Sequence, residues 1–482
     1  MASRSRHDAL RGSPRSQIAH VKRFYERFVS DPKFRSALSD ASPAGPSEHA
    51  REITRQYGIE IDPWAIAPLW SAGLKTSFET AELEGFPALK RWKDYSGLQL
   101  DALRSRREFD HADWASSCFA QWRQRQINRV ESELGTAGGI ANRFPVIAME
   151  LSDGCSVGCW FCGVSASRYA GSFPYTQHNA GMWRQVLATV VEQIGKPARE
   201  GFCYWASDPL DNPDYERFAS DYLDIVGALP PITTAVPLRD VSRTRDLLAW
   251  RKRAGSGHDR FSILTVKILD RVHKEFTAEE LIDVECVPQT RGSLLVKTQT
   301  GKLYGHENTA GSQPGSHATD KPRTIACVAG FLVNMVKGEV RLVSPCRARD
   351  EWPDGYIVHR QGRFETAEDF SHVIRSMIDQ VMDVSLIPRS VVRLRADLRM
   401  EMLPQGVQLR SPGTLHKLGR SRDVAMLAHE LARGPQRHQD IMASVMKAGA
   451  NCFAVSRTIQ DLFERGLLSD HPDDINGVGS FA

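Results

Sequence analysis

The sequence predicts an α/β fold with three parts: a helical N-terminal region, a partial β/α barrel and a winged-helix-like C-terminal unit. Three observations support this prediction. Helical periodicity dominates the first 140 residues, strands alternate with helices from about residue 144, and three short strands followed by three helices end the chain. The length of 482 residues is enough for about three domains of ordinary size.

The N-terminal domain, residues 1–140, is expected to be helical behind a loose tail of about 15 residues. Apolar residues at helical spacing mark the first helix: Ile18, Val21, Tyr25 and Phe28. Asp31 caps the next helix, which starts at Pro32. Further helices are expected from Ser47 to before Gly58, from Asp62-Pro63 onward, and over 88–105 and 110–135.

Residues 141–300 alternate between strand and helix patterns, which is typical of parallel β/α architecture. Strands are expected at 145–151, 202–205, 232–236, 261–267 and 284–287. Helices are expected at 182–194, 215–229 and 241–253, and from about 277. Barrel active sites lie at the carboxyl ends of the strands, so the residues after each strand are the candidates for chemistry.

Residues 301–390 are expected to complete the barrel and to link it to the last domain. A hairpin is predicted over 331–343, and it leads directly into the turn Ser344-Pro345-Cys346. Thr366 and Asp369 have the spacing of a capping box, which predicts a helix that continues through about residue 381.

The C-terminal domain, residues 391–470, is expected to be winged-helix-like and to end in a tail at 471–482. Strands are expected at 394–403, 407–409 and 415–418, and helices at 423–431, 437–448 and 452–465. Gly466 is expected to cap the last helix.

Composition argues against several classes of protein. The chain is 41% hydrophobic and 25% charged, which is typical of a globular protein. Its 62 basic and 58 acidic residues leave a net charge of +4, so nucleic acid is not an expected partner. No apolar run approaches the ~20 residues of a membrane helix, and no hydrophobic segment follows the basic N-terminus, so neither membrane insertion nor secretion is expected. The nine cysteines then favour a reducing compartment, the cytoplasm.

Three cysteines follow the first barrel strand in the pattern C-x3-C-x2-C: Cys155, Cys159 and Cys162. Three thiolates at this spacing can bind three irons of a [4Fe–4S] cube and leave the fourth iron open. The alternative is structural zinc, but no fourth Cys or His stands nearby at the spacing of a zinc site. The motif, with Phe161 before its last cysteine, resembles the radical SAM signature. That resemblance implies one [4Fe–4S] cluster and S-adenosylmethionine as cofactors, with Phe161 on the adenine side.

A second candidate segment, Ala206-Ser207-Asp208 before Pro209, stands at the end of the second strand. Radical SAM enzymes commonly carry two small residues, an acid and a proline there, so the resemblance implies that this segment contacts S-adenosylmethionine. Asp208 replaces the usual Glu, which leaves its own contact open, and an Asp-Pro turn is the structural alternative. Ser262 on the fourth strand is a weaker candidate of the same kind.

Six cysteines lie outside the motif: Cys118, Cys203, Cys286, Cys327, Cys346 and Cys452. They are too few and too scattered for a second cluster, so we expect only one. Free cysteines are usually buried and inert. Cys346 is the first candidate for chemistry because it ends a strand in a Ser-Pro-Cys turn, and Cys327 is the second.

The C-terminal domain resembles the PqqD-like elements that recognise leader peptides of ribosomally made precursors. In such elements the leader adds a strand at a sheet edge and packs on the last helix. Here that resemblance implies binding along Leu415–Leu418 and Cys452–Arg465. A winged helix can instead bind DNA, but the last helix is not very basic, which disfavours DNA.

Taken together, the chain resembles the proteusin-type radical SAM peptide epimerases. The resemblance covers most of the length and includes Lys22-Arg23-Phe24 with Asp31-Pro32, the stretch Tyr57–Pro63, the Cys155 loop, the turn at Cys346 and the C-terminal element. It implies a partial (β/α)6 TIM barrel of the radical SAM type. It also implies an electron donor such as flavodoxin or ferredoxin.

The implied reaction converts L-residues of a precursor peptide to D-residues. A 5′-deoxyadenosyl radical removes the α-hydrogen, and a thiol on the opposite face, Cys346 or Cys327, returns a hydrogen atom. Three alternatives remain. A radical SAM crosslinking enzyme would usually need auxiliary clusters, an Fe–S nucleic-acid-binding regulator would need a basic recognition helix, and a leader-binding scaffold would have no use for the cysteine motif.

Overall fold

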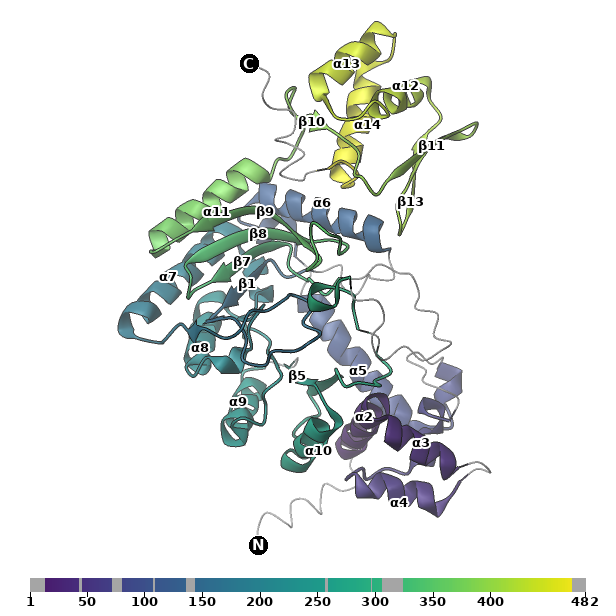
Figure 1. Ribbon diagram of the computed structural model, residues 1–482, viewed down its shortest axis with the longest axis vertical. Coiled ribbons are helices and arrows are strands. Elements are labelled where there is room, and N and C mark those ends of the chain that lie inside the picture. The colour runs from purple at the N-terminus through teal and green to yellow at the C-terminus, as the bar shows by residue number, and fades with distance from the viewer. Residues whose placement is uncertain are drawn as a thin grey trace.

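The structure, a computed structural model, describes residues 14–42, 46–71, 80–106, 109–135, 144–255, 259–295, 297–305 and 324–469. N-terminal helices, a central group of sheets and helices, and a C-terminal unit follow one another along its long axis (Figure 1). The architecture is therefore mixed α/β, as predicted. The expected C-terminal tail and nearly all of the expected N-terminal tail lie outside the described residues. No described helix has both the length and the apolar character needed to cross a membrane.

The N-terminal region is helical, as predicted. Its elements are α2 (Pro14–Ser30), α3 (Pro32–Asp40), α4 (Glu48–Gln56), η1 (Pro63–Leu69), η2 (Thr80–Leu83), α5 (Pro87–Arg106), η3 (His111–Asp113) and α6 (Ser117–Leu134). The Asp31 side chain accepts a hydrogen bond from the backbone N–H of Lys33 at 2.9 Å, which confirms the predicted cap of α3. The segment from Pro63 is a 3-10 helix rather than the expected α-helix, since Pro68 inside it has no N–H to donate.

The central region contains two larger open sheets and a pair of short strands. The first has the order β1-β7-β8-β9 and comprises β1 (Ile147–Glu150), β7 (Gly330–Asn334), β8 (Glu339–Pro345) and β9 (Tyr356–Arg363). The second has the order β4-β5-β6, all parallel, and comprises β4 (Thr233–Thr234), β5 (Asp259–Ile263) and β6 (Val284–Pro288). β1 pairs in parallel with β7 on one edge. On the other edge Ala148 bridges to Phe202, and this single bridge is all that forms of the strand predicted at 202–205, so that prediction is wrong. Within the described residues these strands do not close into a barrel, and the partial barrel remains a prediction.

The predicted hairpin is confirmed as β7 and β8, and β9 extends it by a strand that the sequence did not predict. Helices that accompany the two sheets are α7 (Gln177–Ile194), α8 (Tyr215–Val226), α9 (Val241–Arg253), α10 (Val266–Glu275) and α11 (Ala367–Val381). The capping box at Thr366 and Asp369 is present at the start of α11.

One predicted strand and one predicted helix are wrong around α10. The fourth strand ends at Ile263 instead of Lys267, and residues 277–283 form turns instead of a helix. The helix lies earlier because the Thr265 side chain accepts a hydrogen bond from the backbone N–H of Ile268 at 3.2 Å and so caps α10. Leu269 on α10 is fully buried against the second sheet, which outweighs the strand propensity of this stretch.

The C-terminal unit contains the expected three strands and three helices. Its elements are β10 (Val391–Val392), β11 (Arg399–Leu403), β12 (Gly406–Arg410), β13 (Leu415–Gly419), α12 (Arg422–Leu431), β14 (Gln436–Arg437), α13 (His438–Lys447) and α14 (Cys452–Glu464). β11 starts later than predicted because Leu394 instead forms an antiparallel bridge with Leu468. Gly466 follows α14 with φ +62°, in agreement with its predicted capping role. The winged-helix assignment itself remains a prediction.

Helix α6 lies between the first sheet and the C-terminal unit (Figure 1). The Arg125 guanidinium stacks 3.9 Å above the ring of Phe463 on α14, and Ser132 Oγ is 2.8 Å from Nε2 of His416 on β13. Gly135 and Gly413 approach so closely that a Cβ on Gly413 would lie 2.2 Å from the backbone N of Gly135. The C-terminal unit is therefore docked on α6 at several points.

Candidate functional site

The cysteine motif lies in a loop at the carboxyl end of β1, as the sequence predicted. The loop leaves β2 (Ser152–Asp153) and returns at β3 (Gly171–Ser172), and these two short strands pair antiparallel. Its three thiols share the same degree of exposure and are half-buried: Cys155, Cys159 and Cys162. This position is open enough for a bound group and close to the end of the central sheet.

Gly154 closes the base of the loop. It has φ +72°, and a Cβ there would lie 2.2 Å from the carbonyl oxygen of Arg168. The next residue, Cys155, donates its backbone N–H to the carbonyl of Ser167 at 3.0 Å. Only glycine permits this contact, because both the backbone angle and the space exclude a side chain.

Gly154→Ala is expected to open the base of the loop and to lower the free energy of unfolding by about 2–4 kcal/mol; if the motif holds the predicted cluster, this variant also loses its iron. Gly158→Ala is the matched control on the same loop. Gly158 also has positive φ, +65°, but a Cβ there meets no atom within 4 Å. We expect Gly158→Ala to lose only about 1 kcal/mol in the free energy of unfolding and to bind as much iron as the wild type. Iron analysis and urea unfolding of both variants would decide; equal iron loss in the two would contradict the role given to Gly154.

Residues that follow β6 cover the outer side of the loop. The backbone N–H of Lys302 donates to the carbonyl of Cys162 at 2.9 Å. Gly301 has φ +59°, and a Cβ there would lie 2.3 Å from the same carbonyl oxygen. The hydroxyl of the neighbouring Thr300 is buried and has no hydrogen-bond partner among the described residues. A polar ligand bound beside the loop would supply the hydrogen-bond partner that this buried hydroxyl lacks.

The donor set fits an iron–sulfur cluster better than a single ion. Burial raises the pKa of Cys155 and of Cys159 to about 11, so a cationic partner is needed to hold them as thiolates at neutral pH. The backbone N–H of Ala166 donates to Cys162 Sγ at 3.3 Å, and such bonds stabilise a thiolate. Ligands of one zinc ion stand about 3.8 Å apart. The three sulfur atoms of the motif, which lie in described residues, are not all within 4.8 Å of one another. They therefore stand too far apart to bind one zinc ion together.

The buried carboxylate of Asp211 anchors the cysteine loop to the segment that follows Phe202. Asp211 Oδ2 accepts the backbone N–H of Ser156 at 2.9 Å, and Asp211 Oδ1 accepts its hydroxyl at 2.5 Å. Arg239 then donates to Asp211 Oδ1 at 2.8 Å and to Ser156 Oγ at 2.5 Å. None of these three residues was predicted as part of the site. Asp211, three residues after Asp208, and Arg239, which follows β4, give no motif by themselves.

Glu150 at the end of β1 was also missed. Its Oε1 accepts the backbone N–H of Ala206 at 2.7 Å, and its Oε2 accepts Nδ2 of Asn334 on β7 at 3.2 Å. Burial raises the pKa of this carboxyl group. The signal that the sequence offered for Glu150 was an ionisable residue at the end of an apolar, strand-like run. Glu150 therefore places the predicted Ala206-Ser207 segment against the end of β1, next to the cysteine loop.

Asp208 has a structural role in this arrangement. It caps the short helix η6 (Pro209–Asp211), and its oxygens accept hydrogen bonds from the backbone N–H of Leu210 at 3.0 Å, the hydroxyl of Thr234 at 2.8 Å and the backbone N–H of Ala235 at 2.7 Å. These bonds tie the segment that follows Phe202 to β4 and to the residue after it. The Asp-Pro turn considered as the alternative is thus present, and contact with a cofactor stays a prediction.

The remaining predicted cofactor residues lie apart. Phe161 contacts Trp160 edge to face at 5.4 Å, and Nζ of Lys297 lies 5.1 Å from its ring. Arg291 adds a second cation over Trp160 at 5.4 Å. Ser262 is half-buried in the second sheet, opposite Val287 on β6. The structure brings Phe161 to the cysteine loop, whereas Ser262 belongs to the other sheet.

The two candidate thiols have different surroundings. Cys346 is fully buried, and Glu133 and Arg129 of α6 are among the charged groups that act on its thiol. Burial raises its pKa to about 12, so it is protonated at neutral pH. Cys327 is half-buried and packs against the same apolar cluster as Tyr204 and Trp205, which stand just before the predicted cofactor segment.

Comparison with known proteins gives one extensive similarity. The uncharacterized protein y4wI of Sinorhizobium fredii is 37% identical over 466 residues, which cover 95% of this chain and 89% of that protein. This chain belongs to the same family. No family model matches the chain. Among solved structures, BtrN in complex with AdoMet and 2-DOIA is similar over 41% of this chain and 72% of that chain, with a TM-score of 0.29 and 14% identity.

The buried Asp208 predicts a pH dependence of stability. Burial raises its pKa from 3.8 to about 6, so the folded protein binds this proton more tightly than the unfolded chain. The stabilising contribution is present below about pH 4 and is lost as the pH rises through about 6. We therefore expect the free energy of unfolding of the wild type, relative to Asp208→Asn, to fall by up to about 3 kcal/mol over that interval. Urea unfolding of both proteins at several pH values measures this; a constant difference would contradict it.

Proposed function

We propose that this chain is a radical SAM enzyme and, more specifically, a peptide epimerase. The observation that carries the proposal is the C-x3-C-x2-C loop at the end of β1, beside the Ala206-Ser207 segment that Glu150 holds. The thiols of Cys155, Cys159 and Cys162 would hold the cluster. When bound, the cluster and S-adenosylmethionine supply a radical that removes a hydrogen atom from the substrate.

The chain's own residues would position the cofactor and the loop. Glu150 fixes the backbone of Ala206, so small side chains at 206 and 207 leave room for a ligand to approach the strand end. Asp211 and Arg239 hold the loop from one side through Ser156. On the covering side, the backbone N–H of Lys302 holds the Cys162 carbonyl.

A peptide substrate is supported by the form of the C-terminal unit. β13 is one of the two edge strands of the sheet β11-β12-β13, and an edge strand offers backbone groups to an added strand. Leu415 on this strand is 41% exposed and Phe453 at the start of α14 is 84% exposed. These two elements are the ones that the resemblance to PqqD-like domains assigns to leader binding. Apolar side chains on both would pack against a leader.

Hydrogen return requires a protonated thiol next to the substrate carbon. The thiol would give one hydrogen atom to the carbon radical and be left as a thiyl radical, which the external electron donor and a proton would restore. Cys346 was our first candidate from the sequence, but its full burial beside α6 disfavours it. Cys327 is half-buried and packs against the same apolar cluster as Trp205, which favours Cys327 as the donor.

The test uses the reconstituted protein in deuterium oxide, with each short peptide that the open reading frames next to its gene encode as the candidate substrate. Epimerisation should add about one mass unit per converted residue, because the thiol exchanges its hydrogen with solvent. Cys327→Ala should still cleave S-adenosylmethionine but produce no D-residues, while Cys346→Ala should produce them. Epimerisation by the first variant but not the second would reassign the donor to Cys346. Loss of two mass units without deuterium uptake would replace epimerisation by crosslinking.

A further inference from the structure

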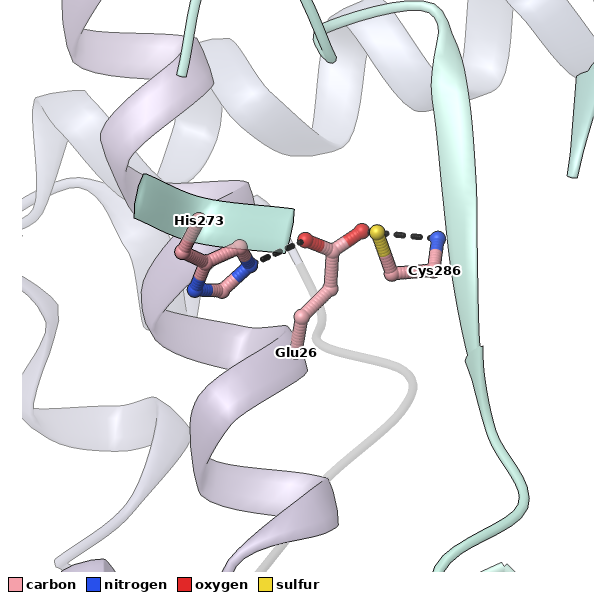
Figure 2. Close-up of side chains that lie close together, drawn as sticks. All are labelled: Glu26, His273 and Cys286. Atoms are coloured by element: carbon pink, nitrogen blue, oxygen red, sulfur yellow. Dashed lines mark hydrogen bonds and ion pairs between the residues drawn. The ribbon is translucent and has the colours of Figure 1, made fainter. Parts of the chain in front are cut away.

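A second group of metal-binding side chains lies away from the cysteine loop, where the N-terminal helices meet the second sheet. Glu26 comes from α2, His273 from α10 and Cys286 from β6, and their ligand atoms all lie within 4.8 Å of one another. Figure 2 shows the imidazole and the thiol approaching the Glu26 carboxylate from opposite sides. It is the only group of this kind that the described residues contain.

His273 has an unusual environment for a buried polar side chain. Its side chain is 3% exposed, and neither ring nitrogen has a hydrogen-bond partner among the residues that the structure describes. The nearest acceptor is Glu26 Oε2, 3.6 Å from Nε2, which is longer than a hydrogen bond. Leaving a buried polar group unpaired costs about 1–3 kcal/mol, so a bound group that accepts this nitrogen's lone pair would stabilise the fold.

We propose that Glu26, His273 and Cys286 bind a zinc ion that joins the N-terminal helical region to the central region. The combination of carboxylate, imidazole and thiolate is typical of zinc ligands and excludes magnesium and calcium, which prefer oxygen alone. On binding, the Cys286 thiol gives its proton to solvent. The charges of Glu26 and of the thiolate then neutralise the ion. A water molecule would occupy the fourth position.

Lys22 is the residue that competes with this ion. Its Nζ lies 2.5 Å from Glu26 Oε1, which also accepts the backbone N–H of Cys286 at 3.0 Å. The Lys22 side chain is 16% exposed, so its ammonium group has a route to solvent when an ion enters. Lys22→Met should therefore tighten zinc binding by about tenfold, because it removes a positive charge next to the site. A purely structural Lys22–Glu26 pair would give no such gain.

The first experiment measures zinc in the full-length protein with its iron–sulfur cluster, after growth with zinc and dialysis against a chelator. We expect about one zinc per chain in the wild type. Cys286→Ser and His273→Gln should each weaken zinc binding by about tenfold or more. Cys203→Ser is the matched control, since Cys203 and Cys286 are both 1% exposed but Cys203 is not in the group. Equal zinc contents in Cys286→Ser and the wild type would overturn the proposal.

A second measurement does not depend on whether those variants fold. Cobalt(II) is added to the full-length chain in which Cys155, Cys159 and Cys162 are replaced by alanine. A near-ultraviolet thiolate-to-cobalt band that zinc removes is the expected result. Absence of the band would overturn the proposal. Neither readout involves S-adenosylmethionine or peptide, so a negative result here leaves the proposed enzymatic function unaffected.

Discussion

Cys159→Ala is expected to abolish both iron binding and cleavage of S-adenosylmethionine. Cys159 is the central cysteine of the loop, and Cys155 and Cys162 alone supply too few thiolates for a cube that needs three. The wild type should bind about four irons per chain after anaerobic reconstitution, and the variant close to none. Iron analysis, the visible absorption of the cluster and chromatography of 5′-deoxyadenosine measure the two losses.

The matched control is Cys118→Ala. Cys118 lies on α6, is half-buried like Cys159, and packs at the border of the main apolar core. It should keep its cluster and cleave S-adenosylmethionine at the wild-type rate, apart from a small loss of stability. If Cys159→Ala retained a full complement of iron, the cysteine motif would not be the cluster site and the proposed function would fail.

Local signals predicted the fold best where they agreed with burial. The Asp31-Pro32 cap, the hairpin of β7 and β8 and the capping box of α11 were found because each depends on a few neighbouring residues. The region around α10 was predicted wrongly because its strand-like residues 261–267 contain Thr265, which caps a helix. β9 was missed since its alternation is interrupted by charged residues at its exposed end.

Only the three cysteines of the site could be predicted from the sequence. The spacing of the three cysteines and their position after a strand are visible in the sequence. The contacts that hold the loop are long-range: Asp211 reaches Ser156, and Glu150 reaches Ala206 and Asn334. Pairs of residues separated by 50 or more positions leave no periodic or local pattern. For the same reason the group of Glu26, His273 and Cys286, taken from three separate elements, was not foreseen.

Arg129→Met is expected to destabilise the protein by about 3–5 kcal/mol, because it leaves a buried carboxylate without its partner. Arg129 on α6 is 2% exposed at its side chain and Glu133 is 5% exposed, with 2.9 Å between Nη1 and Oε1. Nη2 of Arg129 also donates to Ser344 Oγ at 2.8 Å and to the carbonyl of Pro345 at 2.7 Å. The same change therefore loosens the turn that carries Cys346. Urea unfolding measures the free energy.

A double variant separates the charge from the packing. In Arg129→Met with Glu133→Gln the buried negative charge is gone. In the wild type the backbone N–H of Arg347 donates to Glu133 Oε2 at 2.9 Å, and the amide oxygen of the variant can still accept this bond. This variant should be more stable than Arg129→Met alone, with a coupling of about 1–3 kcal/mol. Arg55→Met, which breaks an exposed pair with Glu48, should cost about 0.5 kcal/mol or less. If the effects of the two substitutions on the free energy of unfolding simply added, the buried ion pair would contribute nothing. α6 would then hold the Cys346 turn through packing and the Nη2 hydrogen bonds alone.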